Sequence, residues 1–96
     1  MSRFHPDMIR KELTILNKLG LHARPAAMFV KAASACESEV LVEKDEEQVN
    51  GKSIMGLMML AAGCGAKITV ITEGSDEAEV MAKLEVLVNG GFTEGS

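Results

Sequence analysis

The chain has no tryptophan, no tyrosine and only three phenylalanines among its 96 residues. Its longest apolar run, residues 54–62, is much shorter than the roughly 20 residues that a membrane-spanning helix needs. The first ten residues have no hydrophobic segment of the kind found in signal peptides. The net charge of −4 means that no basic excess favours contact with phosphate backbones. We therefore expect a soluble, cytoplasmic protein that neither inserts into a membrane nor binds nucleic acid.

Cysteine is also scarce. Cys36 and Cys64 are too few for a disulfide framework, and neither lies in a spacing typical of metal ligands. We expect two reduced, inert thiols; a redox switch is the alternative, and it would require a depressed thiol pKa. The sequence also has no nucleotide-binding loop and no metal-ligand cluster, so we expect no metal and no cofactor.

The apolar content of 47% is enough for one globular domain with a single core. We expect an N-terminal arm at residues 1–10, a domain at residues 11–90 and a loose C-terminal tail at residues 91–96. His5 falls in the arm and has no suitable partner nearby in the sequence, so we interpret it as a solvated histidine.

Apolar alternation predicts strands at residues 11–16, 38–44, 48–50 and 66–72. Helical patterns predict a helix that ends near residue 35, a second at 54–62 and a third that ends at residues 89–91. The spacing of Asp76 and Glu79 is typical of a capping box for the third helix, although Ser75 could provide the cap. The order β-α-β-β-α-β-α predicts an α+β fold of two layers, with one sheet and three helices on one of its faces.

The first helix is expected to carry a phosphate-binding site at its start. Ala26, Phe29, Val30 and Ala33 form one apolar stripe, and Pro25 suits only the first turn of such a helix. His22 then lies just ahead of the helix with Arg24 beside it. The free N–H groups and the positive end of the helix dipole would stabilise an anion there. The simpler alternative is that this residue is only a capping or solvated histidine of the turn.

The second helix is apolar on nearly all sides. We expect its two leucines, Leu57 and Leu60, to face the core, which leaves Ile54, Met55 and Met58 toward solvent. Exposed methionines suit a surface that adapts to several partners. The alternative is that the terminal segments cover these side chains. Ser53, directly before the helix, is a preferred N-cap residue.

Two segments resemble the HPr phosphocarrier family of the bacterial phosphoenolpyruvate-dependent phosphotransferase system. These are Gly20-Leu-His-Ala-Arg-Pro-Ala-Ala27 and, about thirty residues later, Asn50-Gly-Lys-Ser-Ile-Met-Gly56. The resemblance extends over residues 11–88, and the two motifs at this separation are highly specific. It implies a two-layer open-faced β-sandwich whose four-stranded antiparallel sheet has the strand order 1-4-2-3.

The resemblance also implies roles for particular residues. His22 would be phosphorylated on Nδ1 by enzyme I at the expense of phosphoenolpyruvate, and would pass the phosphoryl group to IIA domains. Arg24 would neutralise the phosphate, and Ser53 would be the regulatory serine that an ATP-dependent kinase/phosphorylase modifies in some bacteria. A transcriptional regulator is a further implied partner. The partner-binding surface would comprise Ala23, Ile54, Met55 and Met58.

Several alternatives remain open at this point. Ser53 could be an N-cap and nothing more, and the chain could be a regulatory binding module similar to the paralogues that lack the histidine. A free-standing enzyme is disfavoured because the chain has no paired acid and base groups. A carrier must exchange partners quickly, so we expect a monomer. The family pattern does not distinguish sugar uptake from a nitrogen-related branch, and the acidic turn at residues 45–47 departs from it.

Overall fold

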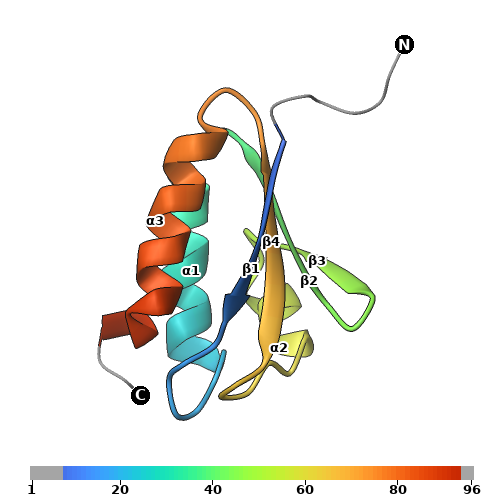
Figure 1. Cartoon of the computed structure of the whole chain (residues 1–96), viewed down its shortest axis with the longest axis vertical. Coiled ribbons are helices and arrows are strands. Elements are labelled where there is room, and N and C mark those ends of the chain that lie inside the picture. Colours follow the sequence, from blue (N-terminus) through green and yellow to red (C-terminus); the bar gives the residue numbers. More distant parts are fainter. Residues whose placement is uncertain (1–7, 94–96) are drawn as a thin grey trace.

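The computed structural model describes residues 8–93 and shows a sheet packed against helices (Figure 1). The elements follow the order β-α-β-β-α-β-α and end in a short 3-10 turn. Their bounds are β1 Ile9–Thr14, α1 Ala23–Ser34, β2 Glu39–Lys44, β3 Glu47–Asn50, α2 Ile54–Met59, β4 Lys67–Glu73, α3 Glu77–Asn89 and η1 Gly91–Thr93.

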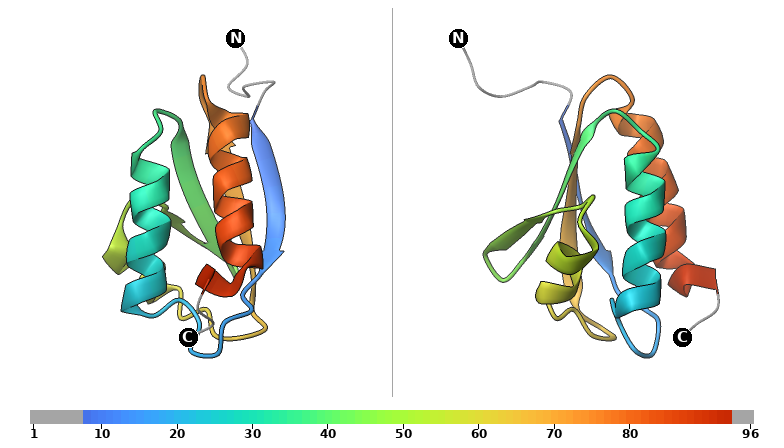
Figure 2. Two further views of the ribbon diagram at one scale, coloured as in Figure 1. Left: turned by 90° about the vertical axis from the view of Figure 1, so that its left-hand side faces the viewer. Right: turned by 180° about the vertical axis from the view of Figure 1, so that it is seen from behind.

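The sheet has four strands in the order β1-β4-β2-β3, and every neighbouring pair is antiparallel. This confirms the expected topology. Helices α1 and α3 lie side by side over one face of the sheet (Figures 1 and 2), while the short α2 contacts α1 and β3. Within residues 8–93, no helix has the length and apolar character required to span a bilayer.

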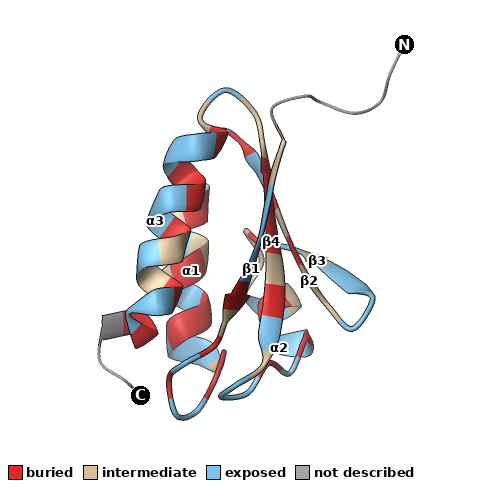
Figure 3. Cartoon of the chain, in the orientation of Figure 1, coloured by how far each residue is buried: buried red, intermediate tan, exposed pale blue. Residues whose placement is uncertain are grey.

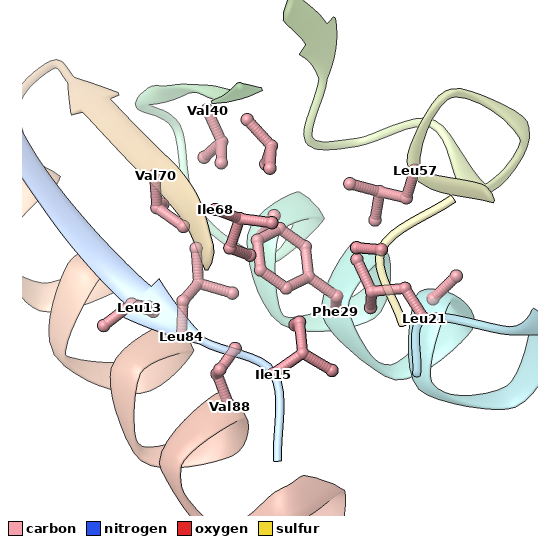
Figure 4. Close-up of a cluster of buried hydrophobic side chains, with 14 of the residues drawn as sticks. Leu13, Ile15, Leu21, Phe29, Val40, Leu57, Ile68, Val70, Leu84 and Val88 are labelled. Atoms are coloured by element: carbon pink, nitrogen blue, oxygen red, sulfur yellow. The ribbon is translucent and has the colours of Figure 1, made fainter. Parts of the chain in front are cut away.

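A single core lies between the sheet and the helices, and the buried stripes of α1 and α3 face it (Figure 3). The alternation in β2 turns Val40 and Val42 inward, and both are almost fully buried. Leu57 of α2 belongs to the same cluster as Phe29 of α1 and Leu84 of α3 (Figure 4). All three helices therefore contribute to one core on one face of the sheet, which confirms the predicted α+β two-layer fold.

Helix α2 is shorter than predicted, because it ends at Met59 rather than at residue 62. The N–H groups of Leu60 and Ala61 bond carbonyls only three residues back, and Ala61 has a φ of +53°. This turn brings the carbonyl of Ala62 next to the segment before α1, where its oxygen accepts a hydrogen bond from Leu21 N at 2.9 Å. A tertiary contact thus accompanies the end of the helix, three residues before the predicted end.

The predicted capping box of α3 is wrong. Asp76 occupies the N-cap position, but its side chain makes no capping hydrogen bond. Its carboxylate instead accepts from the backbone N–H groups of Glu37 (3.0 Å) and Ser38 (2.9 Å) and from the Ser38 hydroxyl. Asp76 therefore joins the start of α3 to the loop between α1 and β2. The side chain of Glu77 accepts from Gly74 N at 2.8 Å within the same turn.

We expect these hydrogen bonds to the Asp76 carboxylate to make folding stability sensitive to acid. The pKa of the Asp76 carboxyl is lowered from its ordinary value of 3.8 to about 2, chiefly by the Ser38 hydroxyl and then by the Glu37 N–H. The stabilisation is therefore nearly complete above about pH 5, and it is lost progressively as the pH falls through 3.8 toward about 2. Urea unfolding of Asp76→Asn should lose this part of the pH dependence, and Ser38→Ala should lose some of it. An Asp76→Asn protein as acid-sensitive as the parent over this range would contradict the assignment.

Both ends of the described chain are more ordered than expected. Strand β1 starts at Ile9, two residues early, while Leu16 lies beyond it and is 53% exposed. At the other end Phe92 was expected in a loose tail, yet it is only 2% exposed and belongs to the core cluster. Its side chain therefore extends the core beyond the end of α3. The expected solvated histidine, His5, lies outside the described residues.

Candidate functional site

The turn before α1 fixes the position of His22. Gly20 has a φ of +73°, and a Cβ at this position would collide with the carbonyl oxygen of Ala62. Only glycine meets both requirements without strain. Leu21 follows with its side chain in the core beside Phe29 (Figure 4), and its N–H bonds Ala62 O. The turn is thereby held on one side by the core and on the other by the segment after α2.

His22 is the N-cap of α1 and has extended backbone angles, with a φ of −78° and a ψ of −171°. Its carbonyl accepts from Ala26 N at 3.0 Å, but its side chain makes no capping bond. Nε2 of the imidazole is buried and has no hydrogen-bond partner within residues 8–93. Nδ1 also makes no hydrogen bond to the described residues, but unlike Nε2 it is not buried, so it is the ring nitrogen in contact with solvent. The accessible nitrogen is free to act as a nucleophile.

The start of α1 is suited to an anion. The first N–H groups of a helix have no partner inside it, and in α1 these belong to Ala23 and Arg24, because Pro25 has none. No acidic residue lies in this first turn. Arg24 is exposed and forms no ion pair with any residue that the structure describes. The free guanidinium, the N–H groups and the helix dipole all favour negative charge beside His22.

A depression of about 300 Å³ adjoins the imidazole. It joins the turn before α1 to the end of α2, and both polar and apolar atoms form its surface. Its lining comprises Leu19, Leu21, His22, Met58, Ala61, Ala62 and Gly63. The structure thus brings the histidine and one of the predicted partner-binding residues, Met58, to the same surface.

The exposure of α2 agrees with the pattern expected from its sequence. Leu57 and Leu60 are buried at 0% and 3% exposure. The three predicted surface residues, Ile54, Met55 and Met58, are 42%, 69% and 43% exposed. The alternative, in which the terminal segments cover these side chains, depends on residues 1–7 and 94–96, which lie outside the described residues. The fourth predicted residue of this surface, Ala23, is also exposed, at the start of α1.

Two exposed apolar residues of this surface were not predicted. Leu19 is 64% exposed and lines the depression with His22, and Met59 is 70% exposed. Met59 follows Met55 by four residues, so helical spacing could have identified it. Leu19 gave no such signal, because it lies in a turn. We call Leu19, Ile54, Met55, Met58 and Met59 together the docking surface.

Ser53 caps α2, as predicted. Its Oγ accepts from Gly56 N at 2.9 Å, and the residue is half-buried. The neighbouring Lys52 ammonium donates to the carbonyl of Cys36 at 3.1 Å, so it is held at the end of α1. Ser53 lies about 7–8 Å along the helix axis from Met58, given the rise of an α-helix. A charge on Ser53 would therefore stand at the edge of the docking surface.

Cys36 is buried and Cys64 is exposed, and both are free thiols. Cys64 Sγ lies 3.6 Å from the carbonyl oxygen of Leu16. Within residues 8–93 no three His, Cys, Asp or Glu side chains are placed to hold a metal ion.

Comparison with known proteins assigns the family. A family model described as the PTS HPr component phosphorylation site matches residues 9–90, nearly the whole described chain. The chain belongs to the HPr family. HPr proteins are the phosphocarriers of the phosphotransferase system, so the resemblance seen in the two sequence motifs is confirmed over the full domain.

Individual relatives include two kinds of HPr protein. Phosphocarrier protein HPr of Neisseria meningitidis is 54% identical over 88 residues, which cover 92% of this chain and 99% of the relative. HPr-like protein Crh of Halalkalibacterium halodurans is 54% identical over 77 residues, covering 80% and 92%. The crystal structure of HPr-C-His from Thermoanaerobacter tengcongensis has a TM-score of 0.87 and 45% identity, covering 90% of this chain and 97% of that one.

Proposed function

We propose that this HPr protein is a histidine phosphocarrier that accepts a phosphoryl group from phospho-enzyme I on Nδ1 of His22 and passes it to IIA domains. The observation that supports the proposal is the difference in burial between the two ring nitrogens of His22. Nε2 is buried, whereas Nδ1 is open to solvent at the start of α1. A phosphoryl group on that nitrogen would meet the free N–H groups and the guanidinium of Arg24.

The transfer needs positioning and charge stabilisation rather than a dedicated acid and base. The Nδ1 lone pair forms the P–N bond while the bond from phosphorus to the donor group of phospho-enzyme I breaks, and the donor retains that electron pair. The ring proton stays on Nε2. The helix N-terminus and Arg24 stabilise the added charge, and the phosphoramidate remains reactive enough to pass on.

The docking surface and Ala23 would bring the two partners to the histidine. Exposed apolar patches beside a reactive group commonly mark interaction sites, and flexible methionines fit more than one partner. Enzyme I and a IIA domain must each approach the same nitrogen, so they would use this surface in turn. A cytoplasmic location follows from these partners and is part of the proposal.

Labelling with phosphoenolpyruvate and enzyme I tests the proposal. The protein should acquire one phosphate that is labile in acid and stable in base, as expected for phosphohistidine. Addition of a cognate IIA domain should then move the label from this protein to the IIA domain. If the protein acquires no label from active enzyme I, the carrier proposal is wrong.

We also propose that Ser53 is a regulatory phosphorylation site for an ATP-dependent serine kinase/phosphorylase. A phosphoserine would place nearly two negative charges beside Ile54 and Met55. Because these side chains belong to the docking surface, the charge would hinder association with enzyme I while leaving the fold in place. A transcriptional regulator would be a further partner of the phosphoserine form.

Substitution of Ser53 separates its two roles. Ser53→Ala should abolish labelling by the serine kinase and cost about 1 kcal/mol of stability from the lost N-cap. Labelling of His22 from phosphoenolpyruvate should stay within about twofold, because the hydroxyl takes no part in that step. Ser75→Ala, at an exposed serine of the turn before α3, is the matched control and should keep full kinase labelling. Kinase labelling that survives Ser53→Ala would refute the site.

A regulatory binding module is the second candidate. It is favoured by similarity to the HPr-like proteins Crh, including that of Bacillus subtilis at 47% identity over 81 residues. Such a module would be labelled on Ser53 only, and the accessible imidazole of His22 argues against it. Solved relatives include an HPr dimer and a swapped Crh dimer. We propose a monomer here, and a dimer in sedimentation at micromolar concentration would refute that.

A further inference from the structure

Asn17 lies five residues before His22 and is one of few buried polar side chains in the described chain. It is only 1% exposed, although an asparagine in a surface turn normally remains in contact with water. A buried polar group is tolerated when its hydrogen bonds are satisfied, and it then fixes the groups it contacts. The question is therefore which groups Asn17 fixes.

The amide of Asn17 holds the peptide that precedes the histidine. Its Nδ2 donates to the carbonyl oxygen of Gly20 at 2.7 Å. The same oxygen accepts from the backbone N–H of His22 at 2.9 Å, and Gly20 N donates back to Asn17 O at 3.1 Å. The oxygen of Gly20 is thus shared between the asparagine side chain and the backbone of His22. A rotation of this peptide would break both bonds and move the histidine.

We propose that Asn17 is a positioning residue for phosphoryl transfer: by holding the Gly20 carbonyl, it sets where the imidazole of His22 stands relative to the start of α1. This inference rests on the proposed carrier function. In-line transfer depends steeply on geometry, so a small displacement of the nucleophile slows the reaction. Asn17 is not part of the docking surface, so it acts on the transfer step and not on partner binding.

A purely space-filling role predicts a different behaviour. Replacing a buried asparagine by leucine keeps its approximate shape and removes its polar groups, and the cost is moderate when no buried partner is left without a hydrogen bond. The Gly20 carbonyl would lose one of its two donors and keep the other. Folding could then persist while the peptide, and with it the histidine, gains freedom. Asn17→Leu therefore separates a positioning role from a packing role.

The test uses the full chain with enzyme I and phosphoenolpyruvate. For Asn17→Leu, kcat for phosphorylation of His22 should fall at least tenfold, while KM for this protein stays within twofold. For Asn17→Asp, which puts a second acceptor where the donor was, kcat should fall further. Asn89→Asp, at an exposed residue of α3, is the control and should match the parent. Circular dichroism and thermal unfolding confirm that each variant is folded.

The outcomes are distinct. A kcat within twofold of the parent in folded Asn17→Leu would overturn the inference, as would a rise in KM with kcat unchanged. If Asn17→Asp does not fold, Asn17→Leu alone decides. Failure of the proposed carrier function would look different, because the parent protein itself would then take no phosphate.

Discussion

Replacing His22 with alanine should abolish phosphorylation from phosphoenolpyruvate and enzyme I, with a residual rate at least about a thousandfold below that of the parent. The imidazole supplies the nucleophile, and alanine offers no atom that could take the phosphoryl group. The fold should remain intact, because the ring makes no hydrogen bond with the residues that the structure describes. Initial rates of label incorporation measure the loss.

The second histidine of the sequence provides the control. His5→Ala should be labelled at the parental rate, since the proposed site is complete without it. Arg24→Ala should retain the nucleophile and lose charge stabilisation, which places its rate between those of the parent and His22→Ala. If His22→Ala and the parent incorporate label equally, the phosphate resides elsewhere and the carrier account fails.

Introducing a charge into the docking surface should produce the second large effect. In Met55→Glu the carboxylate would have to be buried, or left unpaired, when enzyme I docks over α2. We expect KM for this protein to rise tenfold or more, which corresponds to about 1.4 kcal/mol or more of lost affinity. The value of kcat should change by less than about twofold, since His22 and Arg24 are untouched.

Val86→Glu is the matched control for this change. Val86 on α3 is 73% exposed and Met55 is 69% exposed, so both positions accept a carboxylate in the free protein at similar cost. Only Met55 belongs to the docking surface. Equal KM values for the two variants would show that enzyme I does not use α2, and the function of the exposed methionines would need another explanation.

The fold was accessible from the sequence because local pattern and tertiary environment agree along most of the chain. The stripe of Ala26, Phe29 and Ala33 is the buried face of α1, and the alternation of Val40 and Val42 is the buried face of β2. The position of Pro25 in the first turn located the start of α1, and with it the place of His22. These signals depend on residues close together in the sequence.

The features that escaped prediction depend on contacts between distant segments. The hydrogen bond from Ser38 N to the Asp76 carboxylate joins residues 38 positions apart. The local spacing of Asp76 and Glu79 instead suggested a capping box. The early end of α2 follows from the bond between Leu21 and Ala62. Leu19 joins the surface around His22 only because the turn before α1 folds against this same segment. The spacing of apolar residues along the sequence gives no information about such long-range contacts.

The most direct test of the account is to locate the phosphate on the imidazole. The protein, labelled with ¹⁵N at histidine, is phosphorylated with enzyme I and phosphoenolpyruvate and observed by ¹H–¹⁵N and ³¹P NMR. The account predicts one phosphate on Nδ1 of His22, with Nε2 still carrying its proton, because Nδ1 is the nitrogen left open at the start of α1. A phosphate on Nε2, or an imidazole of His22 that does not change while the protein becomes labelled, would contradict it.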